Sequence, residues 1–120
     1  MKGDYITSKI FTVYLLILAF ILLCGTAFGQ IQIAYFNADW NKANGVKWTS
    51  DLEDVTTLSY IDVATQTKMA AKHKIAVIPT IIIFKDDIEV ARFQADLSFK
   101  MVATKEEVQE EIDNQLMSDF

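Results

Sequence analysis

The sequence predicts an α/β domain with a mixed β-sheet flanked by helices, in the order β-α-β-α-β-β-α, behind an N-terminal export segment. Short runs rich in strand-forming residues alternate with helix-like stretches, which favours parallel strands joined by helices. A tight turn at residues 85–87 then separates two apolar strands, and a turn this short makes those two strands antiparallel. An uncharged apolar block near the N-terminus is set apart from this pattern.

Residues 1–29 have the three parts of an export signal. A positively charged start precedes the uncharged apolar stretch 10–23. Ala27 and Gly29 then place small residues at the two positions that a signal peptidase requires. We therefore expect residues 30–120 to form one exported domain, in the periplasm or outside the cell.

The same segment has two alternative interpretations. If it is not cleaved, the uncharged residues 10–28 are about long enough to anchor the chain in a membrane, which needs about 20 apolar residues. That anchor would be the chain's only membrane contact. The other alternative is lipidation at Cys24, but Leu23 stands where bacterial lipoprotein signals have a small residue.

Charge and cysteine content exclude several classes of function. The net charge is −5 without a basic cluster, which argues against nucleic acid and anionic membranes as partners. Cys24 is the only cysteine, so residues 30–120 lack a thiol for a disulfide, a metal site or a nucleophile. The only histidine, His73, has no recognisable carboxylate or ligand partner, and we expect it to be solvated at a helix end. We expect no metal and no cofactor.

The first half of the domain predicts two strands joined by a weak helix. Residues 31–36 and 57–62 are apolar runs rich in strand formers. Between them, residues 41–54 form a poor helix at best, because Asn44-Gly45 is a turn signal. The apolar side chains of this stretch recur at spacings of four and three, which predicts one buried face: Trp48, Leu52 and Val55.

A second helix is expected over residues 65–74. Thr65 can cap its first turn, and Met69 and Ala70 would face the core. Residues 80–84 follow as a strand without polar alternation, which predicts a central position covered on both faces.

The last two elements are a returning strand and a helix. Residues 88–93 are expected to pair antiparallel with the central strand. Thr104 followed by Glu107 fits a capping box. Apolar residues then recur every four positions and predict one stripe on a C-terminal helix: Val108, Ile112 and Leu116.

Four segments resemble the thioredoxin family. Residues 78–85 resemble its Ile-Pro-Thr followed by a hydrophobic strand and a turn, and 36–40 resemble the residues that lead into its Cys-Gly-Pro-Cys motif. Residues 60–63 resemble the strand end that precedes its middle helix, and residues 72–75 resemble its Lys-Tyr-Gly-Ile. The resemblance spans about 30–117 and implies a minimal thioredoxin-like fold without the family's first strand and helix. It also implies that Pro79 follows a cis peptide bond beside the active site.

The redox chemistry of that family does not carry over. Asn41-Lys42-Ala43-Asn44 occupies the place of the Cys-Gly-Pro-Cys motif, so Asn41 and Asn44 are degenerate redox positions. Disulfide exchange needs an attacking thiolate and a resolving thiol, and an amide supplies neither. The resemblance also places Tyr35 at the family's buried aspartate and Leu58 at its accessory lysine. We therefore expect no catalytic residues and no enzyme activity.

The resemblance leaves a groove between Trp40 and Ile78-Pro79-Thr80. In the family, the backbone before the cis proline pairs with an extended peptide, a β-strand addition that needs no thiol. We therefore expect a redox-inactive domain that binds a peptide segment or a partner protein. Alternatively, Pro79 only sets its loop and Trp40 is a packed aromatic.

Two other functions stay open. One is residual thiol-disulfide chemistry through Cys24, and the other is a structural subunit of an envelope assembly. The sequence indicates neither the partner nor the oligomeric state.

Overall fold

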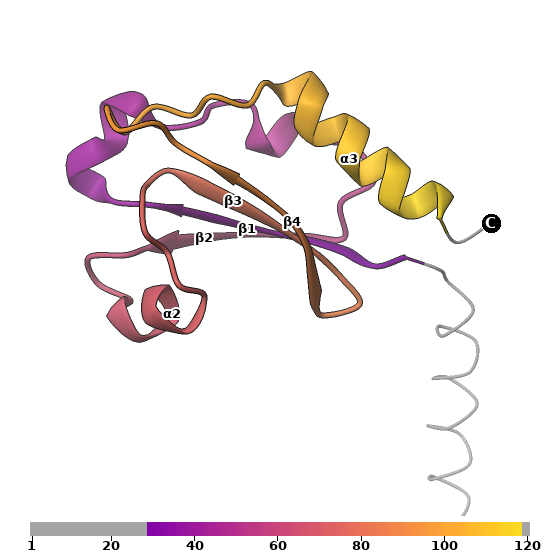
Figure 1. Ribbon diagram of the computed structural model, residues 1–120, viewed down its shortest axis with the longest axis horizontal. Helices are drawn as coiled ribbons and strands as arrows, with labels where there is room; N and C mark the ends of the chain where they lie inside the picture. The colour runs from indigo at the N-terminus through magenta and orange to yellow at the C-terminus, as the bar shows by residue number, and fades with distance from the viewer. Residues whose placement is uncertain (1–28, 119–120) are drawn as a thin grey trace, which may run out of the picture.

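The computed structural model describes residues 29–118, which form a four-stranded sheet with helices on both faces (Figure 1). The predicted export segment, Gly29 excepted, and Cys24 lie outside the described residues. The elements are β1 (Ile31–Asn37), β2 (Thr57–Asp62), α2 (Thr67–Lys72), β3 (Thr80–Lys85), β4 (Ile88–Gln94) and α3 (Lys105–Met117). Within the described range, no helix has the length and apolar character needed to cross a membrane.

The sheet has the order β2-β1-β3-β4. β1 pairs with β2 in parallel, whereas β1 with β3 and β3 with β4 are antiparallel. This confirms the mixed sheet and the hairpin that the sequence predicts. Lys85 pairs with Ile88, so the hairpin turn has only Asp86 and Asp87 at its centre, and both have positive φ (52° and 68°). Positive φ at both central positions is what a type I′ hairpin requires.

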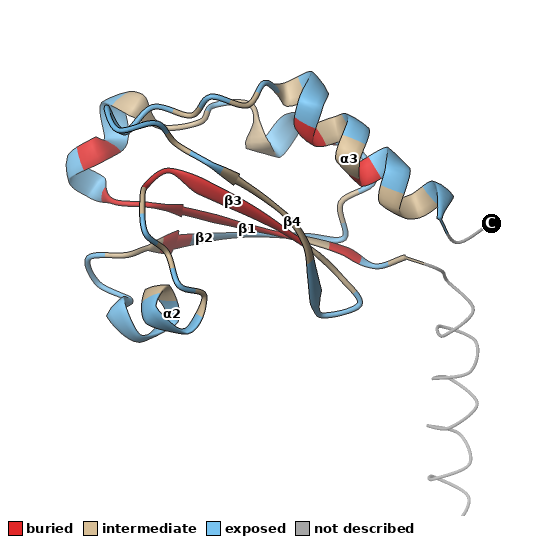
Figure 2. Cartoon of the chain, in the orientation of Figure 1, coloured by how far each residue is buried: buried red, intermediate tan, exposed pale blue. Residues whose placement is uncertain are grey.

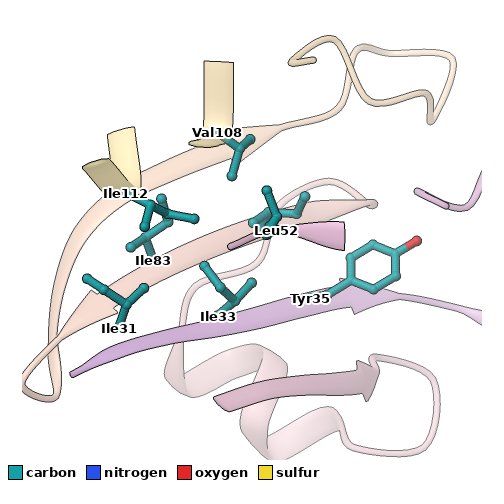
Figure 3. Packing of buried hydrophobic residues seen from close by; sticks show 8 residues of the cluster. Ile31, Ile33, Tyr35, Leu52, Ile83, Val108 and Ile112 are labelled. Carbon is teal, nitrogen blue, oxygen red and sulfur yellow. The ribbon is translucent and has the colours of Figure 1, made fainter. Parts of the chain in front are cut away.

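The larger core lies between the sheet and α3 (Figure 3). Side chains alternate along a strand, so every second residue of β1 and β3 faces this side. Val108 and Ile112 of α3 are fully buried against them, and Leu116 packs at the edge, which confirms the predicted stripe. The buried residues of this cluster are Ile31, Ile33, Tyr35, Leu52, Ile81, Ile83, Val108 and Ile112. The Thr104 side chain caps α3 by accepting a 3.2 Å hydrogen bond from the Glu107 backbone N–H.

The opposite face of the sheet has a smaller core under α2. Ala34, Phe36, Ile61 and Ile82 form its buried part. The His73 ring lies 5.7 Å from the Phe36 ring and 5.5 Å from the Phe84 ring (centroid distances), so His73 is half-buried. The sequence predicts a solvated His73, and that prediction is wrong. Its position directly after a short helix brings it over the sheet.

Three helix predictions need correction. Residues 41–54 form no α-helix: two 3-10 helices, Asp39–Asn44 and Thr49–Asp51, stand there. The predicted apolar face nevertheless meets the main core: Leu52 is buried in it, and Trp48 and Val55 pack against it partly buried. The second helix is shorter than predicted, its N-cap is Gln66 in place of Thr65, and Met69 is 38% exposed. Met69 lines an open hollow together with residues of β1 and β2, which is why its side chain stays partly exposed.

Candidate functional site

The candidate site lies at one end of the sheet, where β1 ends and β3 begins (Figure 1). Phe36 of β1 pairs with Thr80 of β3, which brings the two segments that flank these strands together. The 3-10 helix Asp39–Asn44 follows β1 directly, and Ile78-Pro79 precedes β3 directly. The antiparallel register therefore unites Trp40, Asn41 and Asn44 with Ile78, Pro79 and Thr80, although nearly forty positions separate them.

The Ile78–Pro79 peptide bond is cis, as the resemblance implies. Pro79 and Thr80 are fully buried, and Ile78 is buried as well. The Thr80 hydroxyl donates a 2.6 Å hydrogen bond to the Val77 carbonyl, and the Pro79 carbonyl accepts one of 3.0 Å from the Ala95 N–H. Within residues 29–118, neither the N–H nor the C=O of Ile78 has a hydrogen-bond partner. Buried backbone groups are nearly always paired, so these two are available to an incoming chain.

Three asparagines form a hydrogen-bonded ladder, and two of them, Asn41 and Asn44, stand where the resemblance implies the two cysteines. The Asn44 side-chain amide donates to the Asn41 side-chain oxygen over 3.0 Å. The Asn41 amide donates in turn to the Asn37 side-chain oxygen over 3.1 Å, and the Asn37 amide donates to the Tyr35 hydroxyl over 3.3 Å. Asn37 and Asn41 are buried, so this ladder satisfies polar groups that would otherwise be costly to bury.

The two ends of the ladder tie in the surrounding backbone. The Tyr35 hydroxyl accepts a 2.7 Å hydrogen bond from the Val46 N–H, which fixes the chain after the 3-10 helix. The Asn41 amide also donates to the Phe99 carbonyl over 3.1 Å, across 58 positions of sequence. Tyr35 therefore has a structural use for its hydroxyl at the position where the resemblance implies a buried carboxylate.

A hollow of about 210 Å³ lies beside the cis proline. Its walls are apolar: Trp40, Val63, Ile75, Ala76, Val77, Ile78 and Phe99. The Trp40 side chain is 65% exposed, and its ring meets the Phe99 ring edge-on with the centroids 5.2 Å apart. Trp40 is thus a wall of the groove and is not packed into the core. An exposed tryptophan beside an apolar hollow is the kind of surface that partners contact.

Phe99 is the site residue that the sequence patterns do not reveal. It has a φ of 62°, in the left-handed region that non-glycine residues rarely adopt. The turn that holds it is closed by Asp96, whose carboxylate accepts hydrogen bonds from the Ser98 hydroxyl (2.6 Å), the Ser98 N–H (2.8 Å) and the Lys100 N–H (3.2 Å). No periodic pattern marks a loop residue of this kind, so only the fold brings Phe99 to Trp40.

Two titratable groups near the site have shifted pKa values, one lowered and one raised. The pKa of Asp96 is lowered, first by the Ser98 hydroxyl that donates to it and then by the Lys100 N–H. The pKa of Tyr60, on the neighbouring strand β2, is raised by burial of its hydroxyl and by the negative charge of Asp62. Residues 29–118 contain no cluster of three or more metal-ligating side chains.

Comparisons with known proteins show the fold. No protein-family model matches the chain, and no curated protein matches it in sequence. Solved structures do match. Thioredoxin 1 from Thermosipho africanus is 25% identical, with a TM-score of 0.58 over 73% of this chain and 97% of its own.

Two further thioredoxin structures are similar to this chain. The thioredoxin of Fasciola hepatica is 23% identical, with a TM-score of 0.54 over 78% of this chain and 88% of its own. A mutant thioredoxin from Halobacterium salinarum is 17% identical, with a TM-score of 0.56 over 72% of this chain and 75% of its own. The order and pairing of the four strands, the cis proline and these matches together show that the chain has a thioredoxin-like fold.

Proposed function

We propose that this chain is a redox-inactive, exported thioredoxin-like domain that binds an extended segment of a partner protein in the groove between Trp40 and Pro79. It is not an enzyme under this proposal. The observation that carries it is the pairing of two features: the unbonded backbone groups of Ile78 and the exposed indole of Trp40 across an apolar hollow.

The groove suits an extended chain for two reasons. The free N–H and C=O of Ile78 can pair with a peptide backbone, which supplies affinity independent of sequence. The apolar walls, which include Val63 and Ile75, can receive one aliphatic or aromatic side chain of that peptide. Backbone pairing and one anchored side chain are the usual division between affinity and specificity in strand addition.

The ladder supports the loss of redox chemistry. The side-chain amides of Asn41 and Asn44 form hydrogen bonds with each other, and the Asn41 amide also bonds to Asn37 and to the Phe99 carbonyl. An amide is not a thiol and cannot exchange disulfides. Those bonds also hold the two aromatic walls in place, because Asn41 follows Trp40 in sequence and binds the carbonyl of Phe99. The amides of Asn41 and Asn44 thus stabilise the walls of the groove, at the positions where the family has its dithiol.

A peptide library tests the proposal. We would display random dodecapeptides on phage, select them on the tagged full chain, and measure the selected peptide by fluorescence anisotropy. Trp40→Ala should weaken binding about 30-fold, which corresponds to the loss of about 2 kcal/mol typical of an interface anchor. Ile88→Ala is the matched control, because Ile88 is as exposed as Trp40 (67% against 65%) and lies at the opposite end of the sheet.

Two results would contradict the proposal. One is the selection of no peptide above background, and the other is a peptide that binds Trp40→Ala as tightly as the wild type. The redox part is tested separately, with the insulin-reduction assay in dithiothreitol, where we expect no acceleration. Turnover in that assay would instead favour an oxidoreductase that uses Cys24. The N-terminal sequence of the chain recovered from the cell envelope tests export and cleavage before Gln30.

A further inference from the structure

The two edges of the sheet differ in how they are protected. β4 carries Glu89 and Arg92, which form a 2.8 Å ion pair, and its pairing with β3 is interrupted by a register shift at Ile83/Phe84. Charges and bulges are the devices by which proteins keep an edge strand from pairing with another chain. β2 has neither over residues 57–60, and within residues 29–118 no strand lies on its outer side.

The backbone groups on the open side of β2 belong to Leu58 and Tyr60. The Asp86 N–H donates to the Gln30 carbonyl, so the even-numbered residues of β1 bond toward β3 and the odd-numbered ones toward β2. The Val63 N–H donates to the Asn37 carbonyl, which continues that pattern on β2. The odd-numbered residues of β2 therefore bond to β1, and the N–H and C=O groups of Leu58 and Tyr60 face outward.

The side chains of the same two residues are also exposed. Leu58 is 41% exposed and Tyr60 is 53% exposed, and all four residues from Thr57 to Tyr60 are exposed (Figure 2). The Tyr60 ring is nevertheless held in place, because it packs against the Tyr35 ring with the centroids 5.5 Å apart. An ordered apolar strip thus runs beside a row of unpaired backbone groups.

We propose that two copies of this chain pair through β2, antiparallel about a two-fold axis at Ser59. An interface with two-fold symmetry must be self-complementary. The register with its axis at Ser59 meets this requirement. Leu58 of each copy lies opposite Tyr60 of the other, their outward N–H and C=O groups exchange hydrogen bonds, and an aliphatic side chain faces an aromatic one on both sides of the axis. The pairing would join the two sheets into one of eight strands, because each sheet contributes four.

Side-chain polarity favours this register over its neighbour. With the axis at Ser59, Asp62 lies opposite Thr56 of the other copy, and no two like charges are opposed. With the axis at Tyr60, Asp62 would lie opposite the apolar Leu58. The chain is acidic as a whole, with a net charge of −5, so the two copies repel each other at long range. Salt that screens this repulsion should therefore strengthen the dimer.

Substitution of Leu58 tests the pairing in the full chain. Sedimentation equilibrium of the wild type should fit a reversible association to twice the 13.6 kDa mass, tightening as salt rises from about 0.05 to about 0.5 M. The N–H of Leu58 points outward and makes no hydrogen bond to β1, and Leu58→Pro removes it. This variant should therefore abolish the dimer while it keeps the circular dichroism spectrum of the wild type. Leu58→Ala keeps that N–H and should weaken association only in part.

The apolar N-terminal block is common to all these variants, so association driven by that block would persist in Leu58→Pro. That result would overturn the proposal, as would a monomeric wild type. Should Leu58→Pro lose its native spectrum, Leu58→Lys replaces it, with Ile88→Lys as the control at the end of the β3–β4 hairpin. The lysine at 58 should abolish the dimer and the lysine at 88 should leave it intact.

A cysteine at the axis tests the register. Opposed residues of this non-hydrogen-bonded kind lie about 4.5 Å apart at Cα, which a disulfide can span. In a Cys24→Ser background, Ser59→Cys should give a covalent dimer on mild oxidation. Ser50→Cys, at an equally exposed serine away from β2, should not. Equal cross-linking of the two variants would refute pairing at Ser59.

Discussion

The side chain of Asn44 is hydrogen-bonded to that of Asn41, with 3.0 Å between the donor nitrogen and the acceptor oxygen. The two residues stand at the first and last positions of a tetrapeptide, where the resemblance implies a dithiol. They meet within the 3-10 segment Asp39–Asn44, which is kinked at Asn41 (φ −105°, ψ 18°). A hydrogen bond between two amides thus stands where the resemblance implies a disulfide. Substitution of both asparagines by cysteine should restore that disulfide.

The double variant Asn41→Cys/Asn44→Cys should form an intramolecular disulfide. The side chains already point toward each other, so the geometry needs little backbone movement. In a Cys24→Ser background, we expect two reactive thiols in Ellman's assay after reduction. We also expect slow insulin reduction, since Tyr35 supplies no carboxylate for proton transfer. Asn41→Cys alone is the control. Failure of the double variant to lose its free thiols on oxidation would contradict the inferred equivalence of these positions.

Removal of the Asn41 amide should destabilise the domain. Asn41→Ala leaves the Asn37 side-chain oxygen and the Phe99 carbonyl without their donor. Each unsatisfied buried group costs about 1–3 kcal/mol, and we expect a loss of about 2–3 kcal/mol in the free energy of unfolding by urea titration.

Asn44→Ala is the matched control for that measurement. Asn44 is only half-buried and makes one bond of the ladder, so its removal should cost about 1 kcal/mol or less. If the two alanine variants were equally stable, the ladder would not be an element of the fold.

The attachment of α3 depends on Ile112. Ile112→Ala removes a fully buried side chain between the helix and the sheet, which costs about 2–4 kcal/mol for a residue of this size. Met117, on the same helix, is 68% exposed, and Met117→Ala should change the unfolding free energy by no more than about 0.5 kcal/mol. Chemical denaturation followed by far-UV circular dichroism measures both.

Acid should loosen the turn that holds Phe99. The pKa of Asp96 is lowered because the Ser98 hydroxyl and the Lys100 N–H donate to its carboxylate. The ionised form therefore stabilises the turn above the ordinary aspartate pKa of about 3.9, and this contribution is lost as pH falls from there through the lowered pKa.

The emission of Trp40 can report this change, because its ring contacts Phe99. We expect a transition below about pH 4 in the wild type and its absence in Asp96→Asn. Asp87→Asn, at an exposed carboxyl in the hairpin turn, should keep the transition. A transition that survives in Asp96→Asn would assign it to another group.

Several of the differences between prediction and structure have one physical cause. The apolar spacing of Trp48, Leu52 and Val55 does report burial, yet the backbone there is not an α-helix. Periodicity detects which side chains face the core, whereas the helix type depends on where Asn41 and Asn44 find their hydrogen bonds. The predictions for His73 and Met69 fail because α2 is short: His73, directly after it, packs on Phe36, whereas Met69 is 38% exposed.

By itself, the sequence determined the fold and the absence of cysteine from residues 30–120. Alternating strand and helix patterns, the stripe of α3 and the lone Pro79 are local signals, and local sterics and burial translate them directly into structure. Only the tertiary structure decided which contacts Asn41 and Asn44 make. The bond from Asn41 to Phe99 spans 58 positions, and the unpaired groups of Ile78 and of the β2 edge exist only once the strands are in register. Such contacts depend on how distant segments pack, which no local pattern encodes.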